Sequence, residues 1–258
     1  MVENIVEKIK AADLVLIGIG EELDAFRIVE KEKQYQEFAA RIDKPERVWI
    51  LPFLKKELLK NVEKEKILIY ESLANILKQK NYFVVSLCED GLVERSGLDK
   101  NRIVEPCGGY DKLQCSSKCS AELYSVPEGL FDQIVGFWDR KGESEPKEPS
   151  CPKCGSALVF NNINAADYLE AGYMEGWQRY KKWLQGTVNK SLCVLELGVG
   201  MKYPTVIRWP FEKIVFFNQK AEMFRVHERL YQVAEEIKDR AHGICQKPDE
   251  FLMKFYAK

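Results

Sequence analysis

The sequence predicts an α/β protein with a Rossmann-like, doubly wound parallel sheet, a small cysteine-rich module and a helical insertion. Three observations support this fold class. Short apolar runs rich in β-branched residues recur along the chain, amphipathic segments separate them, and two close pairs of cysteines flank a charged loop. Apolar strands that alternate with helices are typical of a parallel sheet with helices on both faces.

Four apolar runs are expected to form buried parallel strands. Each run is continuous and is bounded by polar or glycine residues, as expected for strands that are covered on both faces. The runs are residues 13–20, 82–87, 191–198 and 213–218.

Two other segments have the apolar spacing of amphipathic helices, namely residues 66–80 and residues 221–242. Residues 31–80 are highly charged and mostly helical in pattern, so this part is expected to be an insertion. The predicted domains are a Rossmann-like domain at 1–30, 81–109 and 188–258, a helical insertion at 31–80 and a small domain at 110–187.

Length and composition favour a cytoplasmic protein that binds neither nucleic acid nor membranes. The chain has 258 residues, enough for a large core, and a net charge of −1. A nearly neutral protein is attracted neither to nucleic acid nor to an anionic membrane surface. The amphipathic start of the chain lacks the apolar core of a signal peptide, and no uncharged run is long enough to span a membrane.

Two cysteine pairs predict a metal site in the small domain. Cys115 and Cys119 lie in "LQCSSKCS", and Cys151 and Cys154 lie in "SCPKCGS". Four thiolates that converge from two pairs suit a structural Zn²⁺ with no open coordination position. The alternative is that they are unrelated buried cysteines. The charged, proline-rich segment 139–150 between the pairs is expected to be a mobile loop.

A Gly-x-Gly turn ends the first predicted strand, at Gly18 and Gly20. Such a turn lets the backbone approach a diphosphate near a helix N-terminus. Glu21 and Glu22 follow directly, and two carboxylates beside a diphosphate would repel it unless they point away.

Taken in order, several motifs resemble the sirtuins, the Sir2 family. These are the Gly-x-Gly strand end, "DGLVERSG" after the second strand, "CGG", the four cysteines and "LGVG" after the third strand. More narrowly, the chain is similar to the microbial branch associated with macrodomain operons, of which some members are protein ADP-ribosyltransferases. The resemblance implies NAD in a cleft between the two domains, and deacylation or ADP-ribosyl transfer. It also implies a protein partner or an acyl- or lipoyl-carrier-type substrate.

Carried over position by position, the resemblance gives both matches and replacements. It makes Asp90 a catalytic residue, with an N-cap as the alternative role. Cys88 stands where the family has the asparagine that positions the ribose. Cys107 stands where the family has its catalytic histidine or glutamine. The implied cofactor-binding residues are Gly18, Gly20, Cys88, Gly198, Gly200, Arg208 and Asn218.

These replacements predict a sirtuin-like protein with a structural zinc and a degraded site for NAD or ADP-ribose, acting as a binding or scaffold protein. A thiol serves as a base only when its pKa is lowered, and the neighbours of Cys88 and Cys107 in sequence are acidic. One alternative is an active NAD-dependent ADP-ribosyltransferase or deacylase that uses Cys107. The other is a redox pair or second metal site formed by Cys88 and Cys107.

Overall fold

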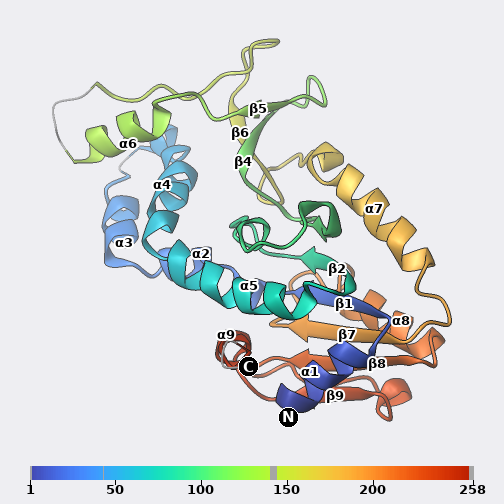
Figure 1. Ribbon diagram of the computed structural model, residues 1–258. Helices are drawn as coiled ribbons and strands as arrows, with labels where there is room; N and C mark the ends of the chain where they lie inside the picture. Colours follow the sequence, from blue (N-terminus) through green and yellow to red (C-terminus); the bar gives the residue numbers. More distant parts are fainter. Residues whose placement is uncertain (1, 43, 140–143, 256–258) are drawn as a thin grey trace.

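Six parallel strands form the main sheet of the computed structural model, which describes residues 2–42, 44–139 and 144–255 (Figure 1). Their order across the sheet is β3-β2-β1-β7-β8-β9. The strands are β1 (Leu14–Ile19), β2 (Asn81–Ser86), β3 (Ile103–Val104), β7 (Leu192–Leu197), β8 (Ala221–Val226) and β9 (Ala241–Ile244).

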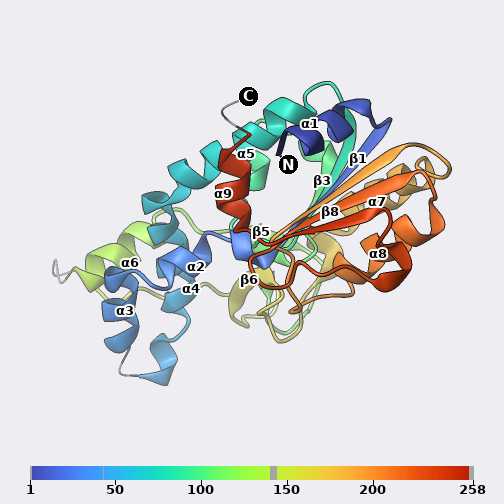
Figure 2. The same ribbon diagram turned by 90° about the horizontal axis from the view of Figure 1, so that it is seen from below.

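Both faces of this sheet are covered, which explains why its central strands have no polar side. In β1, Val15, Ile17 and Ile19 belong to one core, while Leu14 and Leu16 belong to the core on the opposite face. The first core lies under α1, α5 and α9, and the second under α7 and α8 (Figure 2). These helices are α1 (Val2–Ala11), α5 (Glu63–Leu77), α7 (Met174–Gln185), α8 (Arg208–Phe217) and α9 (Pro248–Met253).

A second, antiparallel sheet carries the cysteine-rich part of the chain, in the order β5-β4-β6. Its strands are β4 (Gly108–Cys115), β5 (Leu123–Ser125) and β6 (Leu158–Asn162). Further helices gather beside it, and α4 packs against α6 (Figure 1). They are α2 (Phe26–Val29), α3 (Lys33–Ala40), α4 (Ile50–Leu58) and α6 (Leu130–Trp138).

The predicted fold class is confirmed, and so are three of the predicted strands and the helical character of residues 31–80. The strands expected at 13–20, 82–87 and 191–198 are β1, β2 and β7. β1 and β7 are parallel neighbours at the centre of the sheet, with β2 on one side and β8 on the other. The strand order reverses there, and in open α/β sheets ligands bind beyond the carboxyl ends of the strands at such a point. We call the carboxyl ends of β1, β2 and β7, with the turns that follow them, the switch-point site.

The strand predicted at residues 213–218 is wrong, because this segment is the second half of α8. Its apolar run contains aromatic and β-branched residues, and periodicity does not distinguish such a short run from a buried helix. The helical spacing becomes clear only from burial. Phe211 and Val215, four residues apart, face the core, whereas Phe217 is 78 % exposed.

The helix predicted at residues 221–242 is also wrong. The segment forms β8, an irregular loop with a short 3₁₀ turn (Glu235–Ile237), and the start of β9. Its apolar residues follow helical spacing, but tertiary contacts override that pattern. Buried arginines hold the loop in an irregular conformation, because Arg208 donates to the carbonyl oxygens of Leu230 and Gln232.

No helix in the described part of the chain is both long and apolar enough to cross a membrane. The loop expected at 139–150 lies partly outside the described residues, since 140–143 are not described. Residues 144–149 form neither helix nor strand.

Candidate functional site

The four paired cysteines converge at one end of the small sheet. Cys115 ends β4, and Cys151 and Cys154 lie in the turn before β6. Cys115 Sγ is 3.4 Å from Cys154 Sγ, Cys119 Sγ is 3.5 Å from Cys151 Sγ, and all four sulfur atoms lie within 4.8 Å of one another. A tetrahedral ion with metal–sulfur bonds of about 2.3 Å separates its sulfur ligands by about 3.8 Å. The cluster therefore has the dimensions of a four-thiolate metal site.

The turn that carries the second cysteine pair prepares its thiols for a metal. Gly155 has a φ of 78°, which favours glycine, and its N–H donates to the Cys151 carbonyl oxygen at 2.8 Å. The hydroxyl and the N–H of Ser156 both donate to Cys154 and lower its pKa. The thiolate is the form of cysteine that binds a metal, so this turn favours the binding form.

Glycines let the carboxyl ends of β1 and β7 touch at the switch-point site. A Cβ atom on Gly20 would lie 2.1 Å from the carbonyl oxygen of Gly198, and one on Gly18 would lie 2.6 Å from Ile207 Cγ2. Gly198 itself has a φ of 66°. These predicted cofactor-binding glycines therefore lie together, and close packing requires them whether or not a nucleotide binds.

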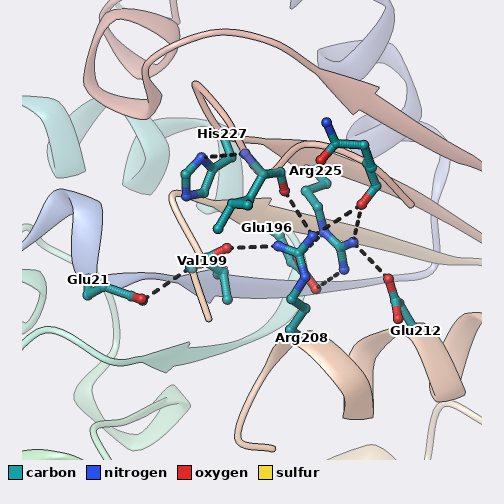
Figure 3. A network of polar contacts seen from close by, with 10 residues as sticks. Glu21, Glu196, Val199, Arg208, Glu212, Arg225 and His227 are labelled. Atoms are coloured by element: carbon teal, nitrogen blue, oxygen red, sulfur yellow. Dashed lines mark hydrogen bonds and ion pairs between the residues drawn. The ribbon is translucent and has the colours of Figure 1, made fainter. Parts of the chain in front are cut away.

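A carboxylate of the protein lies on the turn that follows β7. Gly200 N donates to Glu21 Oε2 at 3.2 Å (Figure 3), and Lys202 N donates to Glu21 Oε1 at 3.4 Å. Gly200 allows this approach, because a Cβ atom there would lie 2.3 Å from Glu21 Oε1. Free backbone N–H groups at a glycine-rich turn are the donors that bind phosphate groups in many nucleotide sites. In this chain Glu21 already uses them.

Arg208, a predicted cofactor-binding residue, donates to backbone carbonyl groups. Its Nη1 is 3.1 Å from the carbonyl oxygen of Val199, and its Nη2 is 2.9 Å and 3.2 Å from those of Leu230 and Gln232 (Figure 3). Arg208 is buried at the start of α8. It thereby ties the turn after β7 to the loop after β8.

A buried ion network lies behind this turn, and its residues were not predicted from the sequence. Arg225 Nε is 2.6 Å from Glu196 Oε2, and Arg225 Nη1 is 2.7 Å from Glu212 Oε1 (Figure 3). The Arg225 and Glu196 side chains are only 1 % and 0 % exposed. The available signal was one charged residue inside each of two apolar strands, in "VLELG" and "MFRVH".

Asp90 and Asp24 join two loops of the switch-point site through backbone hydrogen bonds. Asp90 Oδ2 accepts from Ala25 N at 2.7 Å, and Asp24 Oδ2 accepts from Glu89 N at 2.8 Å. The other oxygen of each carboxylate accepts from the N–H two residues further along the chain. Burial and then the charge of Asp24 raise the pKa of Asp90. Sequence reasoning found Asp90 but missed Asp24.

The Cys88 thiol is buried beneath these loops. Its Sγ lies 3.4 Å from the carbonyl oxygen of Gly20 and 3.7 Å from the Tyr70 hydroxyl. Burial, followed by the charges of Asp90 and Asp24, raises the pKa of Cys88 well above its usual value. Asp24, Cys88 and Asp90 lie close enough to share an ion, but their oxygen atoms already accept backbone N–H groups.

Cys107 is 1 % exposed and precedes β4. Burial and then the charge of Glu89 raise its pKa to about 12, although Lys202 opposes this shift. Cys88 and Cys107 are both free thiols.

Glu89, which sequence reasoning did not select, has an unusual environment. Its carboxylate accepts from Asn164 Nδ2 at 2.6 Å, while burial and then the charge of Asp24 raise its pKa to about 7. Asn164 also lines a cavity of about 260 Å³, together with Tyr110 and Phe160.

Asn218, the last predicted cofactor-binding residue, lies away from the others. It follows α8, and its Nδ2 donates to the carbonyl oxygens of Thr187 and Lys190 at 3.1 Å and 3.0 Å. Lys190 lies two residues before Leu192, where β7 begins, so this position is at the amino end of β7. The structure thus separates Asn218 from the glycines at the carboxyl end of the same strand.

The chain is similar in sequence to two proteins named as ADP-ribosyltransferases, while no protein-family model matches it. It is 24 % identical over 173 residues to a protein ADP-ribosyltransferase of Staphylococcus aureus, covering 66 % of this chain and 55 % of that protein. It is 33 % identical over 150 residues to a probable bifunctional ADP-ribose hydrolase/ADP-ribosyltransferase of Fusarium oxysporum f. sp. cubense, covering 56 % and 25 %. The chain thus matches about half the length of the first relative and a quarter of the second.

Several Sir2 proteins are among the solved structures with the same fold. One, bound to a propionylated peptide, superimposes with a TM-score of 0.58 at 15 % identity, covering 99 % of this chain and 97 % of that one. A mutant Sir2 homologue in complex with ADP-ribose gives a TM-score of 0.59 at 15 % identity, covering 100 % and 96 %. A Sir2 homologue in complex with NAD gives 0.57 at 15 % identity, covering 99 % and 94 %. The chain thus has the fold of the Sir2 sirtuins and is similar in sequence to two proteins named as ADP-ribosyltransferases.

Proposed function

We propose that this sirtuin-like protein binds an ADP-ribose-like nucleotide or a protein partner without turning over NAD. One observation carries the proposal, namely the environment of Cys107, the residue aligned with the catalytic base of the family. A buried thiol with a pKa of about 12 stays protonated at neutral pH, so it cannot take a proton from a substrate hydroxyl group. Cys88, aligned with the ribose-binding asparagine, is a second buried thiol.

The other polar groups expected at an NAD site are engaged within the protein. Asp90 accepts two backbone N–H groups, and Arg208 donates to three carbonyl oxygens. Enzymes stabilise a transition state with polar groups that are held ready for the reacting atoms. Groups that are satisfied internally contribute little to that stabilisation, which supports a binding role.

The same proposal includes a structural Zn²⁺ held by Cys115, Cys119, Cys151 and Cys154. The ion would join the end of β4 to the turn before β6, and four thiolates would leave it no position for a substrate or a water molecule. Its role would therefore be to stabilise the small sheet.

A protein partner, such as an acyl- or lipoyl-carrier-type protein, fits this proposal. The cavity of about 260 Å³ beside Asn164 gives the small sheet room for a group from such a partner. Tyr110 and Phe160 are aromatic residues of its lining, and Asn162 and Asn164 are polar residues of the same lining.

Nicotinamide release and mono-ADP-ribosylation, measured on the purified zinc-loaded protein, test the proposal. We expect no release above the blank with the wild type, and none with Cys107→Ser. The matched control is Cys245→Ser, which changes an exposed thiol. Robust NAD turnover by the wild type would contradict the proposal. Its disappearance in Cys107→Ser, with an unchanged melting temperature, would assign that turnover to the Cys107 thiol.

One observation favours an active ADP-ribosyltransferase as the second candidate. The carboxyl group of Glu89 has a pKa of about 7 and influences the pKa of Cys107. A group that titrates near neutral pH is suited to general acid–base catalysis. This candidate requires NAD turnover that is lost in Glu89→Gln and kept in Cys107→Ser, a pattern that also separates it from an enzyme that uses the thiol.

A further inference from the structure

We infer that the Glu21 carboxylate is an internal competitor for the phosphate groups of a nucleotide, so that the turn after β7 binds a diphosphate only when Glu21 is displaced. This inference rests on the proposed nucleotide-binding role and adds a regulatory contact to the same site. It concerns one side chain and the two backbone N–H groups that it occupies.

The turn is built to hold an anion. The N–H groups of Gly200 and Lys202 converge on the two oxygen atoms of one carboxylate, at 3.2 Å and 3.4 Å. Neighbouring backbone N–H groups that point into one concavity form an anion-binding nest, and here the two N–H groups are two residues apart. The bound Glu21 carboxylate is direct evidence that the turn presents these donors to a negative charge.

The donors are held from behind, independently of Glu21. Arg208 fixes the carbonyl group of Val199, the residue before Gly200, and the same guanidinium group reaches the loop after β8. The buried pair of Arg225 and Glu196 lies next to this clamp, and Arg225 shares the Gln232 carbonyl oxygen with Arg208. The nest should therefore keep its shape when the Glu21 side chain leaves.

The Glu21 side chain is held much less firmly than the other carboxylates of the site. Its hydrogen bonds of 3.2 Å and 3.4 Å are long, whereas those of Asp24 and Asp90 are 2.7–2.9 Å. Within the described ranges, no lysine, arginine or histidine lies at ion-pair distance from the Glu21 carboxylate. The residue is only partly buried, on the short 3₁₀ helix η1 (Glu21–Leu23), so a rotation of the side chain suffices to release the nest.

A carboxylate and a diphosphate cannot share the nest, because both are anions that need the same N–H groups. A diphosphate carries more negative charge and more acceptor oxygen atoms than a carboxylate, so it can replace Glu21 at sufficient concentration. Nucleotide affinity is then lowered by the competition of Glu21 and by its charge.

Titration calorimetry with ADP-ribose tests the inference on the wild type, Glu21→Gln and Glu21→Ala. ADP-ribose has no nicotinamide to lose, so binding is measured without turnover. We expect both variants to bind ADP-ribose about tenfold more tightly, or better, than the wild type. Equal affinity in all three proteins, or weaker binding by both folded variants, would overturn the inference.

The matched control is Glu22→Gln, which removes a charge from the neighbouring residue. The Glu22 carboxylate lies 3.4 Å from His227 Nε2 and makes no contact with the nest donors among the described residues. We expect a much smaller change in affinity. An equal gain in Glu21→Gln and Glu22→Gln would show a general effect of charge and would count against a specific competitor.

Amide hydrogen exchange provides a second readout that does not need a ligand. In Glu21→Ala, the Gly200 and Lys202 amides lose their acceptors and should exchange faster than in the wild type, and ADP-ribose should restore their protection. Unchanged exchange of both amides would contradict the inference. NAD turnover by the wild type would overturn the proposed function and would leave this result intact, so the two failures can be told apart.

Discussion

The four-cysteine cluster and the switch-point site are both assembled from residues far apart in the sequence, yet their polar atoms have different partners. In the cluster, the sulfur atoms of Cys115 and Cys119 face those of Cys154 and Cys151. At the switch point, carboxylates accept backbone N–H groups and Arg208 donates to carbonyl groups. Buried polar groups need partners, and an internal partner competes with a ligand. A site can therefore bind a ligand readily only where its donors and acceptors have no partner within the protein.

The largest effect is expected from Cys151→Ser, which removes one of the four thiol ligands from the cysteine cluster. Structural zinc sites couple metal binding to folding, so loss of a ligand should lower both metal content and stability. We expect about one zinc per chain in the wild type and a strong loss in the variant, with a melting temperature lower by roughly 10 °C. Elemental analysis and thermal unfolding measure these changes.

Cys245→Ser is the control for that experiment, because Cys245 is exposed and lies outside the cluster. It should keep the zinc and the melting temperature. If Cys151→Ser also kept both, the cluster would be four neighbouring thiols that bind no metal, and the contrast between the two sites would disappear.

A smaller effect is expected from Arg225→Met, which breaks the buried ion network behind the switch-point site. The change leaves Glu196 buried without its charged partner. Removal of one member of a buried ion pair costs about 3–5 kcal/mol of unfolding free energy. Urea denaturation should report a loss in this range.

Two further variants sharpen that result. Arg95→Met removes a partly exposed ion pair with Glu63, and such pairs contribute about 1 kcal/mol or less. The double variant Glu196→Leu/Arg225→Met should recover part of the lost stability, because no charge remains at the fully buried position 196 and only the partly exposed Glu212 loses its partner. A loss for Arg225→Met no greater than for Arg95→Met would mean that the network does not support the turn.

The central strands could be predicted from the sequence, whereas their neighbours at the carboxyl end of the chain could not. β1 and β7 are buried on both faces, and their sequences are apolar throughout in β1 and apolar except for Glu196 in β7. The segment of α8 was predicted as a strand, because "KIVFFN" has the composition of a strand. The segment of β8 was predicted as a helix, because residues 221–242 have the apolar spacing of a helix. In residues 221–242, Arg208 and Arg225 donate hydrogen bonds to carbonyl groups of the loop and hold it in an irregular conformation. Such long-range contacts leave no pattern in the local sequence.

The cysteine pairs and glycines of the two sites were also predictable, since their spacing follows from local geometry. The partner of Glu21 was not, because Gly200 lies 179 residues further along the chain. The sequence did indicate that Glu21 and Glu22 oppose a diphosphate. Whether a carboxylate points away from the nest or into it depends on how β1 and β7 pack, and Glu21 points into it.

The smallest effect, and the finest test of the contrast, is the pH dependence of Glu89→Gln. The Glu89 pKa is raised from 4.5 to about 7 in the folded protein. The folded state thus binds the proton more tightly than the unfolded chain, and the stability from this group is lost as the pH rises through 7. Glutamine keeps the acceptor for Asn164 but does not titrate, so the variant should gain stability relative to the wild type between pH 5 and pH 8. Because Glu89 is only partly buried, we expect a gain of about 1 kcal/mol.

Melting temperatures across this range measure it, with Glu7→Gln as an exposed control that should show no trend. A difference that stays constant with pH would show that Glu89 is ionised throughout. That result would remove the support for Glu89 as an acid–base group, because its carboxylate would not exchange a proton at neutral pH.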